Sequence, residues 1–169
     1  TPKPSSAASD VYKRQVIDTL RQTFIRLNYT IDGLHDLLGD VAFSALFRHE
    51  PVPVWLATDH SRDNDTHDLA QLVRLLLLGD SMSAQDIGAL FRIQDDDTLA
   101  SFLNCALFTS SDGMNYQVAL DVRPIDTGFG VQWVFSDLDG ALFPAKTHDD
   151  HVLGVGEASL SLLRSTPIE

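Results

Sequence analysis

The chain has little positive charge, a single cysteine and no long apolar run, and each shortage excludes a class of function. Lys and Arg together number 12 against 24 Asp and Glu, which gives a formal net charge of −12 at pH 7. An acidic surface repels nucleic acid and anionic membranes. With one cysteine, Cys105, the chain has no internal disulfide. Cys105 stands among apolar residues, and we expect a buried small hydrophobe rather than a nucleophile.

Targeting and membrane-spanning segments are also missing from the sequence. No apolar run approaches the roughly 20 residues that a transmembrane helix needs, and the first 15 residues contain no apolar core of a secretory signal. We therefore expect a cytoplasmic protein without membrane contact. Residues 1–15 are polar, rich in Pro and Ser, and lack an initiating Met. We expect them to be a disordered leader that is not native to the protein.

Hydrophobic periodicity predicts a small helical subdomain over residues 16–58. An amphipathic helix covers 16–28, Thr30 caps a short second helix that ends at Gly39, and a third helix follows Asp40. Two prolines end that third helix, so the sequence EPVPVWLAT is expected to run as an extended strap. The polar, acidic residues 59–68 are expected to form a loop that separates this subdomain from the rest.

Residues 69–145 show the pattern of a winged-helix-like unit. A leucine-rich helix ends at Gly79, a second opens at Ser83 with Asp86 three residues later, and a third follows three aspartates. Strict alternation then predicts a β-hairpin wing, whose apolar positions are Tyr116, Val118, Leu120 and Val122 on one strand and Val131, Trp133 and Phe135 on the next. The predicted fold class is α+β, with residues 146–169 forming a turn and a helix.

The expected recognition helix of this unit is unsuited to DNA. Residues 95–108, with the sequence DDDTLASFLNCALF, contain no Lys or Arg. A phosphate-binding surface needs cations, because release of condensed counterions supplies most of the affinity. We therefore expect no direct DNA binding by this domain.

Four motifs indicate chemistry but are incomplete. WVFSDLDGALFP resembles the first motif of haloacid-dehalogenase-like phosphatases, with Asp137 as nucleophile and Asp139 as acid/base, yet Ala141 replaces the usual Thr. VLGVGEASLSLL has G-x-G before a helix but not the third glycine of a dinucleotide loop. The acidic loop and the HDDH sequence lack the ligands of a calcium or zinc site. We assign no catalytic, metal-binding or cofactor-binding residue.

Six segments together resemble one family. In chain order they are YTIDGLHDLLGD, HEPVPVWLAT, DLAQLVRLLLLGD, ALDVRP, WVFSDLD and DHVLGVGEASLSLL. They are similar to the N-terminal domain, of uncharacterised function, of actinobacterial-type class I S-adenosylmethionine-dependent methyltransferases of the small-methyltransferase type. Related enzymes modify ribosomal RNA or glutamine side chains of release factors. The resemblance covers residues 16–167.

The resemblance implies an accessory, substrate-positioning domain that is inert by itself, with S-adenosylmethionine bound by a catalytic domain beyond Glu169. That catalytic domain is the implied partner. By analogy of position, an edge of the substrate and cofactor pocket falls on His151, Gly154, Gly156, Glu157 and Ser159. Two alternatives remain open: a non-enzymatic winged-helix module for protein interaction or dimerisation, and the phosphatase. The sequence does not define the oligomeric state or the methylated substrate.

Overall fold

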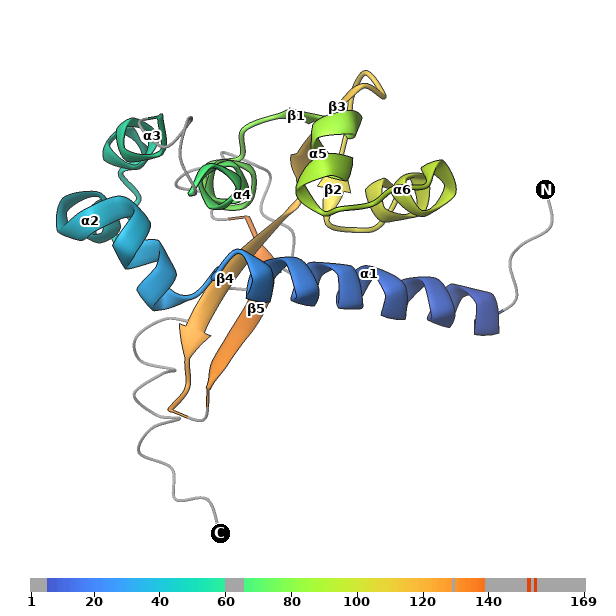
Figure 1. The fold of residues 1–169 in the computed structure, drawn as a ribbon, viewed down its shortest axis with the longest axis horizontal. Coiled ribbons are helices and arrows are strands. Elements are labelled where there is room, and N and C mark those ends of the chain that lie inside the picture. The colour runs from blue at the N-terminus through green and yellow to red at the C-terminus, as the bar shows by residue number, and fades with distance from the viewer. Residues whose placement is uncertain (1–5, 60–65, 129, 139–151, 153, 155–169) are drawn as a thin grey trace, which may run out of the picture.

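The computed structural model describes residues 6–59, 66–128, 130–138, 152 and 154 of the chain. Within these residues the protein has the predicted mixed α+β class, with six helices and two small antiparallel sheets. In Figure 1 the long helix α1 (Ser6–Arg26) runs along one side of the molecule. Helices α2 (Ile31–Phe47) and α3 (Pro51–Asp59) lie beyond its C-terminal end.

Helix α1 begins earlier than the sequence predicts. The helix starts at Ser6, so the prediction of a disordered leader over residues 1–15 is wrong from Ser6 onward. Once the amphipathic part is helical, each further residue adds a hydrogen bond without the cost of nucleation. Gln15 also contacts the winged unit, where its Nε2 atom donates to Thr98 Oγ1 over 3.4 Å. Residues 1–5 lie outside the described part.

The two-part helix α2 confirms the predicted cap and break. The Thr30 hydroxyl accepts a hydrogen bond from the Gly33 N–H over 3.0 Å, which satisfies one free donor of the first turn. Gly39 has φ 69° and ψ 169°, so the two helical stretches predicted on either side of it meet at a kink. A left-handed φ is tolerated at this position because glycine has no Cβ.

Residues 51–59 form helix α3 rather than the predicted extended strap. Pro51 and Pro53 both lie in the first turn of α3. The N–H groups of a first turn have no partner inside the helix, so proline loses nothing there, and its fixed φ suits the helical backbone. The two prolines therefore start a helix where we expected them only to end one.

Helix α4 (His67–Leu77) begins a winged-helix arrangement. It is followed by β1 (Met82–Ser83), α5 (Ala84–Leu90), α6 (Asp96–Leu103), β2 (Phe108–Thr109) and β3 (Asn115–Val118). The three short strands form an antiparallel sheet in the order β1-β3-β2. Ser83 caps α5, as the sequence predicts, and Asp95, the first of the three aspartates, caps α6.

The wing is not the hairpin that the sequence indicates. The loop between β2 and β3 occupies the wing position, whereas β4 (Leu120–Asp126) and β5 (Val131–Asp137) form a separate two-stranded sheet. Apolar and polar residues alternate without interruption over residues 116–122, so the sequence predicts a single strand there. At Ala119, however, the chain leaves one sheet and enters the other, and no periodicity reports that change of partner.

One hydrophobic core joins the helices and the hairpin. Helix α4 supplies the largest share, with seven buried residues. They pack with side chains from α1, α2, α5, α6 and both sheets, including Phe24, Tyr29, Ile87, Phe102 and Val122. Because this single cluster spans the boundary predicted between the helical subdomain and the winged unit, the described parts pack as one body.

Candidate functional site

One residue of the predicted pocket edge, Gly154, lies beside the end of strand β5. The Asp137 N–H donates to the Val152 carbonyl over 3.0 Å, and the Val152 N–H donates to Asp137 Oδ2 over 2.6 Å. Gly154 lies beside the same strand, since a Cβ atom placed on it would be 3.3 Å from Ser136 Oγ. The structure therefore brings Gly154 to β5. His151, Gly156, Glu157 and Ser159 lie outside the described residues.

This geometry gives Asp137 a structural partner. Its carboxylate accepts the Val152 N–H, and β5 belongs to a two-stranded antiparallel sheet. Metal-assisted sites at strand ends are typical of the carboxyl edge of a parallel sheet, and every strand pair among the described residues is antiparallel. Asp139 lies outside the described part. The arrangement does not favour the phosphatase alternative.

The hairpin is attached to the turn between α1 and α2 by buried hydrogen bonds. The Tyr29 hydroxyl donates to the Val122 carbonyl over 2.6 Å, and Trp133 Nε1 donates to the Tyr29 carbonyl over 2.8 Å. Burial raises the pKa of the Tyr29 hydroxyl well above its usual value, and Asp121 adds to this effect. Asp121 is itself nearly buried and pairs with Arg123, with 2.7 Å between Oδ2 and Nε. These contacts fix the strand end where Asp137 lies.

The surface that DNA-binding winged helices use is acidic. Residues 93–122, which include α6 and the wing, contain no Lys or Arg. Asp95, Asp96 and Asp97 lie at the start of α6, and Asp112 lies in the wing. Hydrogen bonds from Asn115, and then from the Met114 N–H, hold the pKa of Asp112 well below its usual value. That carboxylate is therefore ionised at neutral pH.

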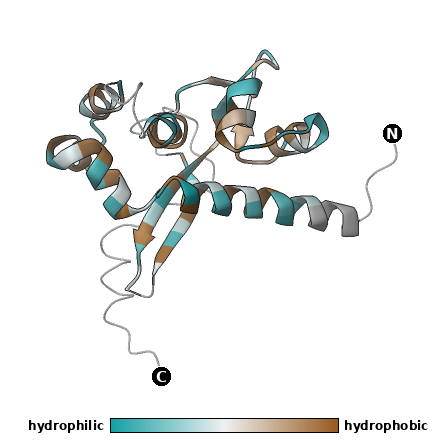
Figure 2. Ribbon diagram, viewed as in Figure 1, coloured by the Kyte–Doolittle hydropathy of each residue, from teal (hydrophilic) through white to brown (hydrophobic). Residues whose placement is uncertain are grey.

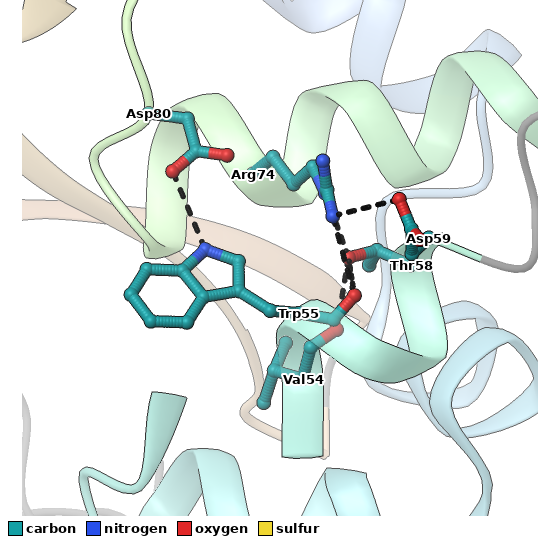
Figure 3. A network of polar contacts seen from close by, with 6 residues as sticks. All are labelled: Val54, Trp55, Thr58, Asp59, Arg74 and Asp80. Carbon is teal, nitrogen blue, oxygen red and sulfur yellow. Dashed lines mark hydrogen bonds and ion pairs between the residues drawn. The ribbon is translucent and has the colours of Figure 1, made fainter. Parts of the chain in front are cut away.

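A hollow of about 620 Å³ lies between α3, α4 and the start of the winged sheet. Most of its lining residues carry a polar side chain, and the lining comprises Thr58, His67, Ala70, Gln71, Arg74, Asp80, Ser81, Met82, Ser83, Asp86 and Asn115. Figure 3 shows Arg74 reaching from α4 to α3. Its Nε donates to Thr58 Oγ1 over 2.9 Å, and its Nη2 donates to the Trp55 carbonyl over 3.3 Å.

The charged groups of this hollow are engaged with their neighbours. Arg74 Nη2 lies 3.5 Å from Asp59 Oδ1, and Trp55 Nε1 donates to Asp80 Oδ1 over 3.3 Å (Figure 3). Asp86 accepts the Ser83 hydroxyl at the start of α5 over 2.6 Å. The contacts connect α3 to α4 and to the start of β1. The arrangement suits a structural junction that is open to solvent.

Two further groups bear on catalysis. Cys105 is half-buried, and burial raises the pKa of its thiol, which disfavours the reactive thiolate. In the part of the chain that the structure describes, no three His, Cys, Asp or Glu side chains converge as a metal site would require.

Sequence reasoning missed the Arg74 junction because its partners come from different elements. One signal was available: Arg74 is the only charged residue in the apolar run LVRLLLL of α4. A charge on the apolar side of a helix needs a polar partner. The sequence did not show that the partner is α3, since that segment was expected to be extended.

The described residues thus define an acidic, winged-helix-like α+β protein. Residues 26–104 match the family model of a domain of unknown function, DUF7059. No curated protein and no solved structure matches the chain. Among the described helices, none combines the length and the apolar character needed to cross a bilayer.

Proposed function

We propose that this chain is the accessory domain of a class I S-adenosylmethionine-dependent methyltransferase, and that it positions a substrate without catalysing the reaction. The support comes from the six segments that resemble such domains. Contacts join several of these segments although they are distant in sequence. Tyr29 of the first bonds to Val122 of the fourth, and Trp133 of the fifth bonds back to Tyr29. The resemblance therefore follows the packing of the molecule rather than one local motif.

The contact between Asp137 and Val152 extends this argument to the sixth segment, which contains the pocket-edge residues. Under the proposal, Val152 and Gly154 contact the hairpin beside a catalytic domain, which binds S-adenosylmethionine and supplies the catalytic groups. The methylated substrate is RNA, protein or a small molecule, and the protein is cytoplasmic. If the substrate is RNA, the phosphate contacts come from the catalytic domain, because residues 93–122 have no cation.

The test compares this chain with the whole reading frame that contains it. We expect the codons after Glu169 to encode a strand, a glycine-rich loop and an N-P-P-Y-like motif. Isothermal titration with S-adenosylmethionine should then show binding by the longer protein and none by the 169-residue chain. Cofactor binding by the chain alone, or a downstream sequence without such motifs, would contradict the proposal.

The interaction-module alternative has its own support in exposed apolar side chains. Helix α3 presents Val52, Trp55 and Leu56 to solvent. A defined oligomer of this chain would favour this alternative, and it would be compatible with an accessory role in a larger enzyme. The phosphatase alternative predicts hydrolysis of an aryl phosphate that Asp137→Asn abolishes, and the engagement of Asp137 with Val152 argues against it.

A further inference from the structure

We infer that residues 152–156 of this chain pair with the outer edge of β5 as a third strand of the hairpin sheet. Two contacts show where this strand starts. The Asp137 N–H donates to the Val152 carbonyl over 3.0 Å, and a Cβ atom on Gly154 would lie 3.3 Å from Ser136 Oγ. Because Gly154 lies against the residue before Asp137, the chain returns along β5 in the antiparallel direction.

The outer edge of β5 has backbone groups that such a strand can pair with. The Asp137 N–H donates to Val152, so it points away from β4, and in an antiparallel pair the backbone groups of every second residue point the same way. The N–H and C=O groups of Phe135 and Trp133 therefore also point outward. Among the described residues, none bonds to these outward groups. The hydrogen bonding that begins at Asp137 can thus continue along the strand.

The opposite edge of the hairpin is protected against further pairing, whereas the edge of β5 is not. On β4, Pro124 has no N–H to donate, and the Val122 carbonyl already accepts the Tyr29 hydroxyl. Free edge strands often carry Lys or Pro, because an unpaired edge invites pairing with another chain. Residues 131–137 contain neither, and Figure 2 shows hydrophobic residues, in brown, on this strand. Strand β5 therefore has the composition of a strand that is paired on both sides.

The chain's own continuation is the occupant that the contacts favour. The segment VLGVG of residues 152–156 has no charged side chain, and its Val and Leu residues suit a strand. Glycine at position 154 permits the close approach to Ser136. Five residues at roughly 3.4 Å each reach from Asp137 back to the level of Trp133. A segment that is already bonded at Asp137 also has a much higher effective concentration at this edge than a separate molecule.

The third strand would hold part of the predicted pocket edge against the hairpin. Gly156 would lie near Trp133, and the helix that the sequence predicts after the G-x-G motif would begin from that fixed point. This inference does not depend on the methyltransferase proposal, because it concerns only the pairing of the chain with itself.

Residue-resolved amide exchange of the 169-residue chain tests the inference. We expect the Phe135 and Trp133 amides to exchange at least about 100-fold more slowly than unstructured amides. Val134 is the internal control, because its N–H points toward β4 and is protected with or without a third strand. Free exchange at Phe135 and Trp133 beside a protected Val134 would overturn the inference.

A double variant identifies the segment that protects these amides. Val155→Pro combined with Gly156→Pro should speed exchange at Phe135 and Trp133 at least about 10-fold and leave the internal control unchanged. Neighbouring N–H groups of a strand point to opposite sides, so one of the two prolines must remove a bond to β5. Ser165→Pro, beyond the segment, is the matched control and should change none of these rates. Protection that survives the double variant, or that rises with protein concentration, would assign the edge to another occupant and overturn the inference.

Discussion

At the scale of single residues, the buried hydroxyl of Tyr29 is the contact with the clearest consequence. It is fully buried and donates to the Val122 carbonyl, so Tyr29→Phe leaves that acceptor short of a donor in the interior. We expect the free energy of unfolding to fall by about 1–2 kcal/mol. Urea unfolding followed by circular dichroism measures the change. Tyr116→Phe is the control, because the Tyr116 hydroxyl makes only an exposed 3.4 Å contact with the Gly113 carbonyl.

The same residue should make stability depend on alkaline pH. Burial raises the folded-state pKa of Tyr29 above the ordinary value of 10.0, so the unfolded chain loses this proton first. The stabilisation is complete below that ordinary value and is lost as the pH rises from there toward the folded-state pKa. Unfolding of wild type and Tyr29→Phe at about pH 8 and pH 11 should show a smaller stability difference at the higher pH. An unchanged difference would contradict the assignment.

Two glycines of α2 should respond differently to alanine. At Gly39 a Cβ meets no atom within 4 Å, so Gly39→Ala costs only the strain of φ 69° and ψ 169°, a backbone region nearly restricted to glycine, about 1–3 kcal/mol. At Gly33 the Cβ would overlap the Asn28 carbonyl oxygen, and backbone must move. We expect Gly33→Ala to cost more than Gly39→Ala, at least about 3 kcal/mol in urea unfolding. Equal costs at the two positions would contradict this description of the turn before α2.

At the scale of elements, Arg74 links α3 to α4. Its guanidinium bonds to Thr58 and to the Trp55 carbonyl, and a methionine cannot replace either bond. Arg74→Met should lower the free energy of unfolding by about 1–3 kcal/mol and speed amide exchange in α3. Arg74→Lys keeps the positive charge but lacks the planar guanidinium that donates to two acceptors at once. We therefore expect Arg74→Lys to lower the free energy of unfolding less than Arg74→Met does. Arg21→Met, at an exposed position on α1, serves as the control, and equal effects at both sites would contradict the role of Arg74.

Elements whose signals are local were predictable from the sequence. The caps at Thr30, Ser83 and Asp95 and the break at Gly39 depend on side chains within a few residues. Helix α3 was missed because proline was taken as a terminator, although it is equally suited to a first turn. The wing was assigned to the wrong strands because the chain changes sheets at Ala119. That change depends on which strands pair with β3 and β4, and pairing is a tertiary property. Gly154 beside β5 and the Arg74 hollow needed tertiary contacts that no local pattern contains.

At the scale of the whole molecule, the distribution of charge should decide whether the protein binds nucleic acid. Duplex DNA should not bind through the winged unit. Residues 93–122 carry no cation and several carboxylates, so few counterions would be released on contact. Fluorescence anisotropy at about 50 mM salt should show no binding of a labelled duplex at protein concentrations of about 100 µM, the weak end of non-specific affinities. A dissociation constant that rises steeply with added salt would restore the DNA-binding interpretation.

The single-residue step at Ala119 has a mechanical consequence. Strand β3 ends at Val118 and β4 begins at Leu120, so the two sheets are joined by a single residue of extended chain. The Ala119 N–H donates a hydrogen bond to the Leu107 carbonyl over 2.7 Å, which restrains this connecting residue. A force applied to the far end of the β4–β5 hairpin therefore acts directly on β3, because no flexible linker separates the two sheets. Under an applied load, the two sheets should rupture together in one event.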